Sequence, residues 1–565
     1  MARITLVRPA YSAQIYGKVY EQSKDTKREI RPPLGLMAMS GYLKTFGHEV
    51  IIVDGEPGLL SEEETVNRTL ATNPEIVGLT STTPEYPFAY GILKSIKEQR
   101  PDVVTVFGGA HITNLPEHTM ADLDDFVDWG VIFEGEKPMA AIANGNAEEF
   151  LWKPNSNSKL LIANERLTGE ELNTFLPDRE ALNMRDYKFV DTSMGLVQND
   201  ALEIARGCPF ACAFCTSRKT LIQHRSIEHV ISEIVASANK YNTKLFMFFD
   251  DTFTIHKGRA MELFEEIIRL KRKGDLPKDV HFYGFTRANT LHDYELMKAM
   301  KDAGCDKITL GIETGNAEIL RQTFKGTKLD DYRKAYQMLD EFDITKRGSF
   351  IIGHPYESEA TLRDSIDFAL ELDLDEVGVN IMTPYPGQLT YRDALSAKGI
   401  WFSHRVHYEE LRAKDYDITS SWSDFISVNW HDYWREHLRW GSSVVETETL
   451  SAEALVYWHG RFLQEVYGSE QMAKRRQRYI DSGNDDEYWH RPWRVNAERN
   501  RERLEAEKMT GTPTFSAPLH QQFTYAPIML NDYQKNELFM TEGNKRKLLN
   551  DKNAPEHIVS VNAAE

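Results

Sequence analysis

The chain has little cysteine, with four residues among 565. That scarcity excludes a disulfide framework, which small secreted domains build from many paired cysteines. No stretch reaches the roughly 18 apolar residues of a membrane-spanning helix, and the first residues enter a strand pattern, not a signal peptide. A basic excess is also missing, because the net charge is −19, which disfavours a nucleic-acid partner. We therefore expect a cytoplasmic protein without a membrane span, in a compartment where thiols stay reduced.

Three of the four cysteines lie within eight residues. Cys208, Cys212 and Cys215 are spaced C-x3-C-x2-C. Cysteine thiolates are the usual ligands of iron–sulfur clusters, and three of them can hold three irons of a [4Fe–4S] cluster while the fourth iron stays open to a ligand. A zinc site would need a fourth cysteine or a histidine, for which His224 is the nearest downstream candidate. The short spacing favours the cluster.

Cys305 is separate from the other three and follows Gly304 at a predicted junction between a helix and a strand. A buried structural thiol is the first interpretation, and a thiol at a substrate site is the alternative. Because the chain has no further cysteine, a second cluster is excluded.

The first 150 residues alternate between short apolar runs and helical periods. Alternation of this kind is typical of a parallel α/β sheet, whose ligands bind beyond the carboxyl ends of the strands. We therefore predict a Rossmann-like domain over residues 1–150. Strands are expected at residues 4–7, 50–54, 76–80, 103–107 and 131–136, and helices at residues 36–46, 62–71 and 86–99.

A second alternating region follows a connector that we predict over residues 151–195. Six strand–helix units make a partial (β/α)6 barrel over residues 196–400, with its functional groups at the carboxyl ends of the strands. Strands are expected near residues 202–205, 245–249, 280–285, 307–311, 348–352 and 376–380, and helices at residues 228–239, 258–273, 293–303, 329–341 and 359–372.

The last predicted domain, residues 401–565, is rich in aromatic side chains. Eight of the ten tryptophans lie there, and residues 429–441 and 451–467 show helical periods. We predict a mainly helical region, which is either a packing layer over the barrel or an aromatic surface that contacts a substrate.

The cysteine motif, with Phe214 directly before Cys215, resembles that of the radical S-adenosylmethionine (SAM) superfamily. The first domain resembles the cobalamin-binding domain found ahead of many such enzymes, on the evidence of Pro32-Pro33-Leu34-Gly35-Leu36, the turn at residues 108–111 and Gly135-Glu136. The resemblance implies a [4Fe–4S] cluster on the three cysteines, SAM on its open iron, and cobalamin in the first domain. The residues expected near cobalamin are Leu34, Gly35, Ser81, Thr82, Gly108, Gly109, His111, Gly135 and Glu136.

The first domain departs from one pattern. It lacks the Asp-x-His-x-x-Gly motif in which methionine-synthase-type domains carry a cobalt ligand. His111 lies either beside the corrin or at a strand end as a packing residue, and we assign no cobalt ligand.

The resemblance also implies cofactor contacts at the ends of the barrel strands. Asp250 and Asp251 would meet the SAM amino group, with a helix N-cap as the alternative. Arg287 would meet the SAM carboxylate, with an exposed arginine as the alternative. The ribose and methionine would contact the segment of Glu313, and the adenine would contact the backbone at Gly353. Tyr385-Pro386-Gly387 resembles a signature of the cobalamin-dependent branch.

These resemblances imply a methyltransferase. The reduced cluster would cleave SAM to a 5′-deoxyadenosyl radical that takes a hydrogen from an unactivated carbon, and cobalamin would deliver the methyl group. The expected partners are a small-molecule substrate and an external electron donor such as a flavodoxin or ferredoxin. The alternatives are an oxidative cyclase with the same cofactors, a radical SAM enzyme without cobalamin, and a cluster-based redox sensor. We assign no catalytic side chain.

Overall fold

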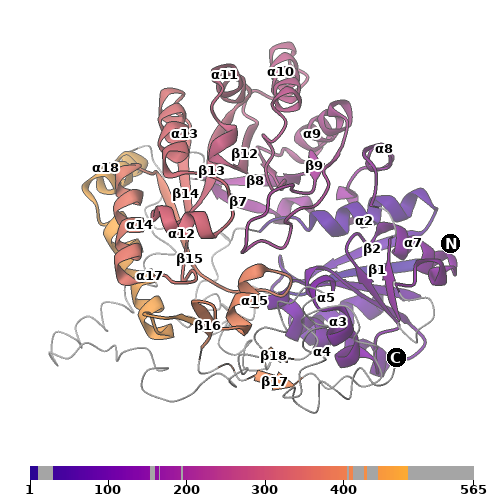
Figure 1. The fold of residues 1–565 in the computed structure, drawn as a ribbon. Helices are drawn as coiled ribbons and strands as arrows, with labels where there is room; N and C mark the ends of the chain where they lie inside the picture. The colour runs from indigo at the N-terminus through magenta and orange to yellow at the C-terminus, as the bar shows by residue number, and fades with distance from the viewer. Residues whose placement is uncertain are drawn as a thin grey trace, which may run out of the picture.

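Two parallel β-sheets organise this computed structural model of the protein (Figure 1). The structure describes residues 1–10, 30–152, 159–163, 166–191, 195–403, 406, 408–410, 426–428 and 443–481. In Figure 1 the sheet from the first third of the chain lies on the right, and the larger second sheet lies above it and to its left. Residues of both regions line one cavity, described below.

The first sheet holds six parallel strands in the order β2-β1-β3-β4-β5-β6. The five predicted strands are confirmed. β6 differs from the prediction, because it lies within the predicted connector, where three residues are too few to show a period. The strands are β1 Arg3–Arg8, β2 Glu49–Asp54, β3 Ile76–Thr80, β4 Val104–Gly108, β5 Trp129–Ile132 and β6 Leu160–Ile162.

The helices between these strands confirm the predictions at residues 36–46, 62–71 and 86–99. Local chemistry sets their ends: Ser61 and Glu64 form a capping box at the start of α3, and Gly145 ends α7 in the left-handed conformation. The helices are α2 Leu34–Thr45, α3 Glu62–Ala71, α4 Tyr86–Gln99, α5 Ala110–Asn114, α6 Pro116–Leu123 and α7 Glu136–Asn144.

The connector is structured and bonded to the first domain. It contains α8 Gly169–Leu172 and β7 Lys188–Asp191, and β7 pairs antiparallel with the first barrel strand. Asp178 accepts a hydrogen bond from Ser40 Oγ on α2 (2.6 Å) and forms an ion pair with Lys44 Nζ (2.5 Å). The connector therefore lies against the first domain along α2.

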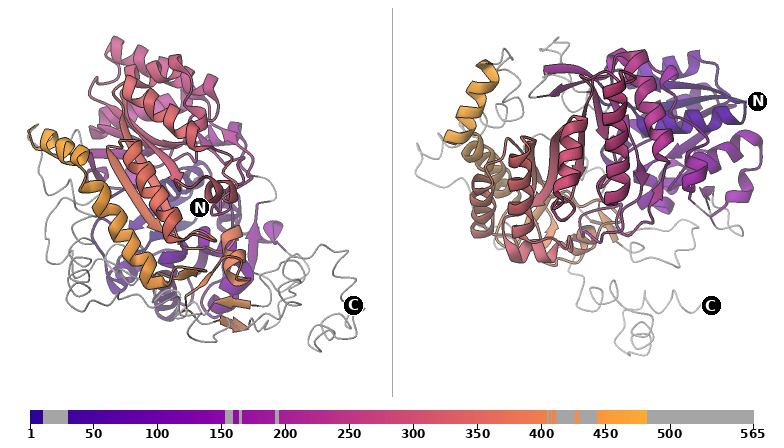
Figure 2. Two further views of the ribbon diagram at one scale, coloured as in Figure 1. Left: turned by 60° about the vertical axis from the view of Figure 1, so that its left-hand side comes forward. Right: turned by 90° about the horizontal axis from the view of Figure 1, so that it is seen from above.

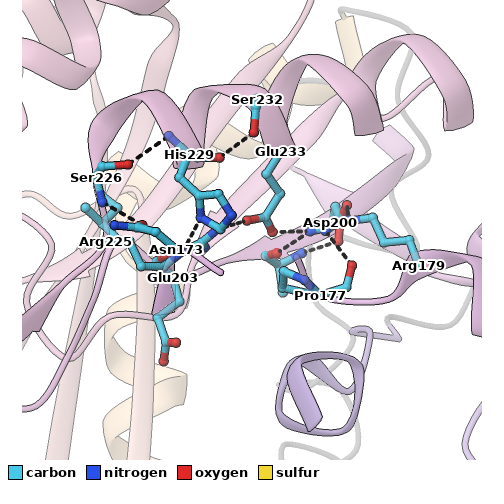
Figure 3. Close-up of polar contacts among 12 residues, drawn as sticks. Asn173, Pro177, Arg179, Asp200, Glu203, Arg225, Ser226, His229, Ser232 and Glu233 are labelled. Atoms are coloured by element: carbon cyan, nitrogen blue, oxygen red, sulfur yellow. Dashed lines mark hydrogen bonds and ion pairs between the residues drawn. The ribbon is translucent and has the colours of Figure 1, made fainter. Parts of the chain in front are cut away.

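A buried ionic network fastens the same connector to the start of the barrel (Figure 3). Arg179 donates through Nε to Asp200 Oδ2 (2.5 Å) and through Nη2 to Glu233 Oε1 (2.6 Å). Arg225 Nη2 donates to the other oxygen of Glu233 (2.5 Å). All four side chains are less than a tenth exposed. Because breaking a buried ion pair costs about 3–5 kcal/mol, this network holds the connector in one place.

The second sheet has the order β15-β14-β13-β12-β11-β8-β7, and its strands from β8 to β15 are parallel. The predicted six-strand partial barrel is confirmed, except that its first strand lies earlier than the predicted residues 202–205, because Gln198, Asn199 and Asp200 interrupt the apolar pattern of β8. The strands are β8 Gly195–Leu202, β11 Leu245–Phe248, β12 His281–Thr286, β13 Cys305–Glu313, β14 Thr345–Ile352 and β15 Glu376–Ile381, and a separate hairpin pairs β9 Ala205–Arg206 with β10 Gln223–His224.

The barrel helices form an arc around the outer face of this sheet (Figures 1 and 2). They confirm the five predicted helices. The bounds are α9 Ile227–Tyr241, α10 Lys257–Lys273, α11 Tyr294–Ala303, α13 Leu329–Glu341 and α14 Glu359–Glu371, with the short helices α12 Ala317–Gln322 and α15 Leu389–Leu395 in loops.

The described part of the last domain packs on the barrel edge. The Tyr467 hydroxyl on α17 donates to Val377 O of β15 (2.9 Å) and accepts from Val377 N (3.0 Å). The helix predicted at 451–467 is confirmed, whereas the helix predicted at 429–441 and most of the tryptophans lie outside the described residues. The elements are α17 Ala452–Tyr467, α18 Glu470–Asp481, and the pairs β16 Ile400–Phe402 with β19 Val445–Thr447 and β17 Tyr408–Glu410 with β18 Ile426–Val428.

Across the described ranges, no helix combines the length and the apolar character that crossing a bilayer requires.

Candidate functional site

The three cysteines lie on one loop between β9 and β10, which we call the cysteine loop (residues 207–222). Thr220 N donates to Cys208 O (2.8 Å) and closes the loop on itself. Gly207 has φ +107°, and a Cβ there would lie 2.3 Å from Leu221 O. Only glycine therefore fits directly before the first cysteine, and the hairpin of β9 and β10 fixes where the loop begins.

The thiols are close enough to affect one another's ionisation. Cys208 and Cys212 are buried, Cys215 is half-buried, and all three are free. Burial, with smaller contributions from Asp251 and the other two thiols, raises the pKa of Cys215 to about 11. An iron–sulfur cluster binds cysteines as thiolates. Its iron ions would supply the positive charge that stabilises three neighbouring thiolates.

A single metal ion fits less well. In the part of the chain that the structure describes, no group of three or more His, Cys, Asp or Glu side chains converges as the shell of one ion must. A cubane cluster spreads its ligands, because each thiolate binds a different iron. His224, the alternative zinc ligand, packs edge-on against His256, with ring centroids 4.7 Å apart. The donor set therefore fits a [4Fe–4S] cluster better than zinc.

Arg287, directly after β12, is buried against the cysteine loop. Its Nη1 donates to Cys212 Sγ (3.5 Å), and its guanidinium lies 3.7 Å from the ring centroid of Phe210. Its Nη2 donates to Lys325 O, and its buried Nε has no hydrogen-bond partner among the described residues. The alternative of an exposed arginine is therefore wrong. The unpaired Nε suits an anionic ligand such as the SAM carboxylate. That contact stays a prediction.

Lys325 is a charged residue of this site that the sequence pattern does not reveal. It is buried in the loop after α12, and its Nζ donates to Glu313 Oε1 at the end of β13. Burial opposes the charge of Lys325, but the Glu313 carboxylate more than compensates, so the pKa of Lys325 is raised. Its Nζ also lies 5.9 Å from the ring centroid of Phe214. Glu313 and Phe214, both predicted site residues, thus meet at one lysine.

The turn after β14 contains a second missed residue, Glu357. Its Oε2 accepts hydrogen bonds from Gly353 N and from His354 N (3.2 Å), and burial raises the pKa of Glu357 to about 8. Burial also lowers the pKa of His354 to about 4, so this imidazole is neutral. The backbone of Gly353 is therefore held rigidly by a buried carboxyl, and its predicted contact with adenine stays a prediction.

Asp250 and Asp251 follow β11 and differ in their surroundings. Asp250 is buried and accepts from Ile204 N (3.0 Å) and Ala205 N (2.7 Å), which fixes the chain ahead of the cysteine loop. Burial raises the pKa of Asp250 to about 7. Asp251 is exposed. Burial raises the pKa of the Cys208 thiol, and the nearby Asp251 carboxylate raises it further. Neither residue caps a helix, because α10 begins only at Lys257. Asp251 is thus the carboxylate left for the predicted SAM contact.

A cavity of about 780 Å³ opens between the first domain and the barrel, at the start of the cysteine loop. One wall comes from the start of α2 and from the loops after β3, β4 and β5. The other wall comes from the barrel, through Glu203, residues 205–207 and residues 249–251. The predicted site residues on the two walls are Leu34, Gly35, Ser81, Thr82, Gly108, Gly109, Gly135, Glu136, Asp250 and Asp251.

The lining of this cavity fits cobalamin. Ser81 Oγ is buried there without a hydrogen-bond partner among the described residues. Gly109 has φ +102°, and a Cβ there would lie 2.5 Å from Ser81 O, so the backbone itself forms the wall. The volume lies in the upper part of the roughly 300–1,000 Å³ range of ligand sites. Apolar side chains cover much of the first-domain wall: Leu6, Leu36, Met39, Leu79, Val106, Val131 and Met139.

His111 lies behind this wall. It is fully buried, its ring stacks on Tyr86 with centroids 4.1 Å apart, and its Nδ1 lies 3.4 Å from Thr83 Oγ1. This placement favours the packing interpretation over a place beside the corrin.

Cys305 begins β13, at the opposite end of that strand from Glu313. It is fully buried, and burial raises the pKa of its thiol well above the usual range. The placement favours a structural thiol.

Two arginines join the walls of the cavity. Arg206 Nη1 donates to Glu136 Oε1 (2.7 Å). Arg166 Nε donates to Glu134 Oε1 (2.8 Å), and its Nη1 donates to Leu221 O on the cysteine loop (2.6 Å). The carboxylate of Glu136, predicted near cobalamin, is thus already paired across the domain boundary.

Comparison with known families divides the chain in the same way. Residues 27–143 match the B12 binding domain, and residues 202–369 match the radical SAM superfamily. The fold and the cavity thus define a radical SAM enzyme with an N-terminal B12-binding domain. An uncharacterised methyltransferase of Pyrococcus horikoshii is 31% identical over 65% of this chain and 79% of its own. The chain belongs to the cobalamin-dependent radical SAM family.

Other similarities agree with this fold. The anaerobic magnesium-protoporphyrin IX monomethyl ester cyclase of Rubrivivax gelatinosus is 28% identical over 63% of this chain and 65% of its own length. The radical SAM methyltransferase TsrM of Kitasatospora setae, solved with cobalamin and a [4Fe–4S] cluster, is 17% identical. It superposes with a TM-score of 0.60 over 90% of this chain and 100% of its own.

Proposed function

We propose that this enzyme transfers a methyl group to an unactivated carbon of a small molecule. The observation that carries the proposal is the cavity that the B12-binding domain and the residues flanking the cysteine loop line together. A shared cavity lets one substrate reach groups held on both walls. The methyltransferase relative of P. horikoshii supports transfer as the reaction class.

The bound cluster, SAM and cobalamin supply the radical and methyl-transfer chemistry, and the protein positions them. Cys208, Cys212 and Cys215 would ligate the cluster. Arg287 holds the cysteine loop through Cys212 and Phe210, and its free Nε would orient the SAM carboxylate. Asp251 would meet the SAM ammonium.

On the other wall, apolar side chains and the backbone at Gly109 would hold the corrin and keep water out of the cavity. Ser81 Oγ would hydrogen-bond to the cofactor, because a buried hydroxyl without a partner is unfavourable.

Product analysis after anaerobic reconstitution tests the proposal. The protein is loaded with iron, sulfide and cobalamin and incubated with SAM, a reductant and a panel of candidate metabolites. We expect a methylated product together with S-adenosylhomocysteine and 5′-deoxyadenosine. Cys208→Ala, treated identically, should give none of them. SAM cleavage without methyl transfer to any compound, in protein that binds cobalamin, would argue against transfer.

An oxidative cyclase is the second candidate. The specific observation in its favour is the similarity to the R. gelatinosus cyclase. A new ring or a hydroxylated product, with 5′-deoxyadenosine but no S-adenosylhomocysteine, would identify this reaction.

We further propose that an external donor such as a flavodoxin or ferredoxin reduces the cluster in the cytoplasm, where a thiolate-bound cluster is stable. Reduction by flavodoxin, its reductase and NADPH in place of a chemical reductant tests this. Absence of turnover with any protein donor would contradict it.

A further inference from the structure

We propose that Glu134 and Glu136 are positioning residues that latch the B12-binding domain onto the cysteine loop and set the separation of cobalamin and cluster. We call these two residues the acidic latch. The inference rests on the proposed function, since it concerns the two cofactors that the reaction needs. It also gives Glu136 a role different from the cofactor contact that its sequence context implies.

The acidic latch is rigid on the side of the B12-binding domain. Glu134 lies in the loop that connects β5 to α7, and Glu136, after Gly135, is the first residue of α7. A Cβ at Gly135 would lie 2.8 Å from Met39 Cε, so this loop packs closely on α2. Leu167 N also donates to Glu134 Oε2 (2.8 Å). Both carboxylates are therefore held in place before they meet their arginines.

The bridge from Glu136 ends next to the first cluster cysteine. Its partner Arg206 lies two residues before Cys208 and is also bound by Glu203 Oε2 (2.7 Å). The side chains of Arg206 and Glu136 are 14% and 6% exposed, so water screens this pair little. Only Gly207 separates Arg206 from Cys208, and the chain packs closely there, because a Cβ at Gly207 would lie 2.3 Å from Leu221 O. A shift of Glu136 is therefore passed to the cluster ligand.

The bridge from Glu134 ends on the other side of the same glycine. Arg166 connects Glu134 to Leu221 O (2.6 Å), and Leu221 O is the atom against which Gly207 packs. The two bridges thus hold the cysteine loop at both ends, at Arg206 directly before it and at Leu221 within it. The two bridges act side by side. Removing one should therefore loosen the position of the cysteine loop relative to the B12-binding domain, and removing both should release it.

The connector does not replace the latch. Asp178 and Arg179 bind α2 and the start of the barrel, but their partners are Ser40, Lys44, Asp200 and Glu233. None of these residues lines the cavity. The bonds of Asp178 and Arg179 fix the domains on one side, and the acidic latch, through Arg206 and the connector residue Arg166, fixes them at the cavity.

Pulsed electron paramagnetic resonance on the full chain tests the inference. The dipolar coupling between cob(II)alamin and the reduced cluster reports their separation. Glu134→Gln, Glu136→Gln and the double variant are compared with Glu465→Gln, which removes a carboxylate that pairs with Arg363 away from the cavity. Iron and cobalamin contents are measured on every sample, and the rate of methyl transfer from SAM to reduced cobalamin is the second readout.

We expect all variants to retain both cofactors. The double variant should show a broadened distance distribution and a methyl-transfer rate lower by about a hundredfold, the cost of ångström-scale misplacement. Each single variant should fall between the double variant and the wild type, and Glu465→Gln should match the wild type. If the double variant folds poorly, Glu134→Gln alone carries the test, because its partner Arg166 is 31% exposed and tolerates the loss.

Two results would overturn the inference. One is a double variant with the distances and the rate of the wild type. The other is loss of cobalamin in proportion to the missing carboxylates with unchanged distances in the loaded fraction, which would make Glu136 a cofactor ligand. Failure of the proposed function is distinguishable, because there the wild type itself would bind no cobalamin or transfer no methyl group.

Discussion

The two walls of the cavity differ in how they can hold a ligand. The wall of the B12-binding domain offers apolar side chains, exposed backbone at Gly109 and one unpaired hydroxyl, Ser81. The barrel wall offers polar groups that are already bonded, such as Arg206 with Glu203 and Asp250 with Ala205 N. Away from the cavity lining, the barrel adds buried charges such as Lys325 with Glu313 and Arg287 against Cys212. The first wall suits recognition by shape, and the second suits recognition by charge. Substitutions that leave the backbone unstrained should therefore affect binding alone on the first wall, whereas substitutions on the second wall should affect both binding and folding.

Removal of a single cluster cysteine is the change with the largest expected effect on the barrel side. We expect Cys208→Ala, Cys212→Ala or Cys215→Ala each to lose the cluster iron and all SAM cleavage, because each thiolate holds one iron. Iron content and 5′-deoxyadenosine are the measurements. Cys305→Ala is the matched control and should keep its iron, since that thiol lies at the far end of β13. SAM cleavage that survives in a cluster-free variant would refute the assignment.

Loss of Lys325 should show how far stability depends on paired charge. Lys325→Gln leaves the buried Glu313 carboxylate without its counter-charge, which should lower the free energy of unfolding by about 3–5 kcal/mol. Denaturant titration measures this change. Combining it with Glu313→Gln should recover much of the loss. Lys298→Gln, which breaks an exposed pair with Asp302, should leave Tm unchanged. An equal effect of Lys298→Gln would contradict the comparison.

Glu357 should make stability depend on pH in a defined direction. Burial raises its pKa in the folded protein to about 8, from an ordinary value of 4.5. Between these values the folded protein keeps a proton that the unfolded chain has released, so the free energy of unfolding falls as pH rises. Glu357→Gln should reduce this slope by up to about 1.4 kcal/mol per pH unit between pH 5 and 8. Unfolding curves at several pH values would show it, and an unchanged slope would disprove it.

Two glycines on the first wall should separate binding from stability. Gly109→Ala places a Cβ against Ser81 O at φ +102°, which should cost about 1–3 kcal/mol and lower Tm. Gly35→Ala adds a Cβ with no atom within 4 Å, and alanine favours a helix by up to about 1 kcal/mol over glycine. We expect Gly35→Ala to keep or raise Tm while it reduces cobalamin retention, because Gly35 lines the cavity. Equal Tm values for the two variants would argue against this view of the wall.

Much of the fold could be predicted from hydrophobic periods alone. The structure places α3 and α4 at the predicted residues, and five of the six barrel strands lie where apolar runs predict them. The exception is β8, which ends at Leu202, where the predicted strand begins. β6 and β7 could not be found in this way. Each has three or four residues, too few to show a period, and their strand conformation depends on pairing with β5 and β8.

The candidate site was predictable only in part, for a related reason. The cysteine spacing is local and visible, whereas the partners of the charged residues are not. Asp250 accepts a hydrogen bond from backbone 45 residues away, a partner that no local pattern shows, and its predicted contact with SAM stays a prediction. Lys325 lies in a polar loop, and only its contact with Glu313 shows why it is buried.

The connector also determines where the chain can be divided into independent fragments. A barrel fragment that begins at Gly195 would leave Asp200 without Arg179 and Glu233 with only one of its two arginines. A cut at residue 150 would separate β6 from its neighbour β5. The workable boundary falls between β6 and α8, where Asp178 loses its partners on α2 but can be solvated by water. Residues 166–191 therefore travel with the barrel as part of its minimal expressible unit.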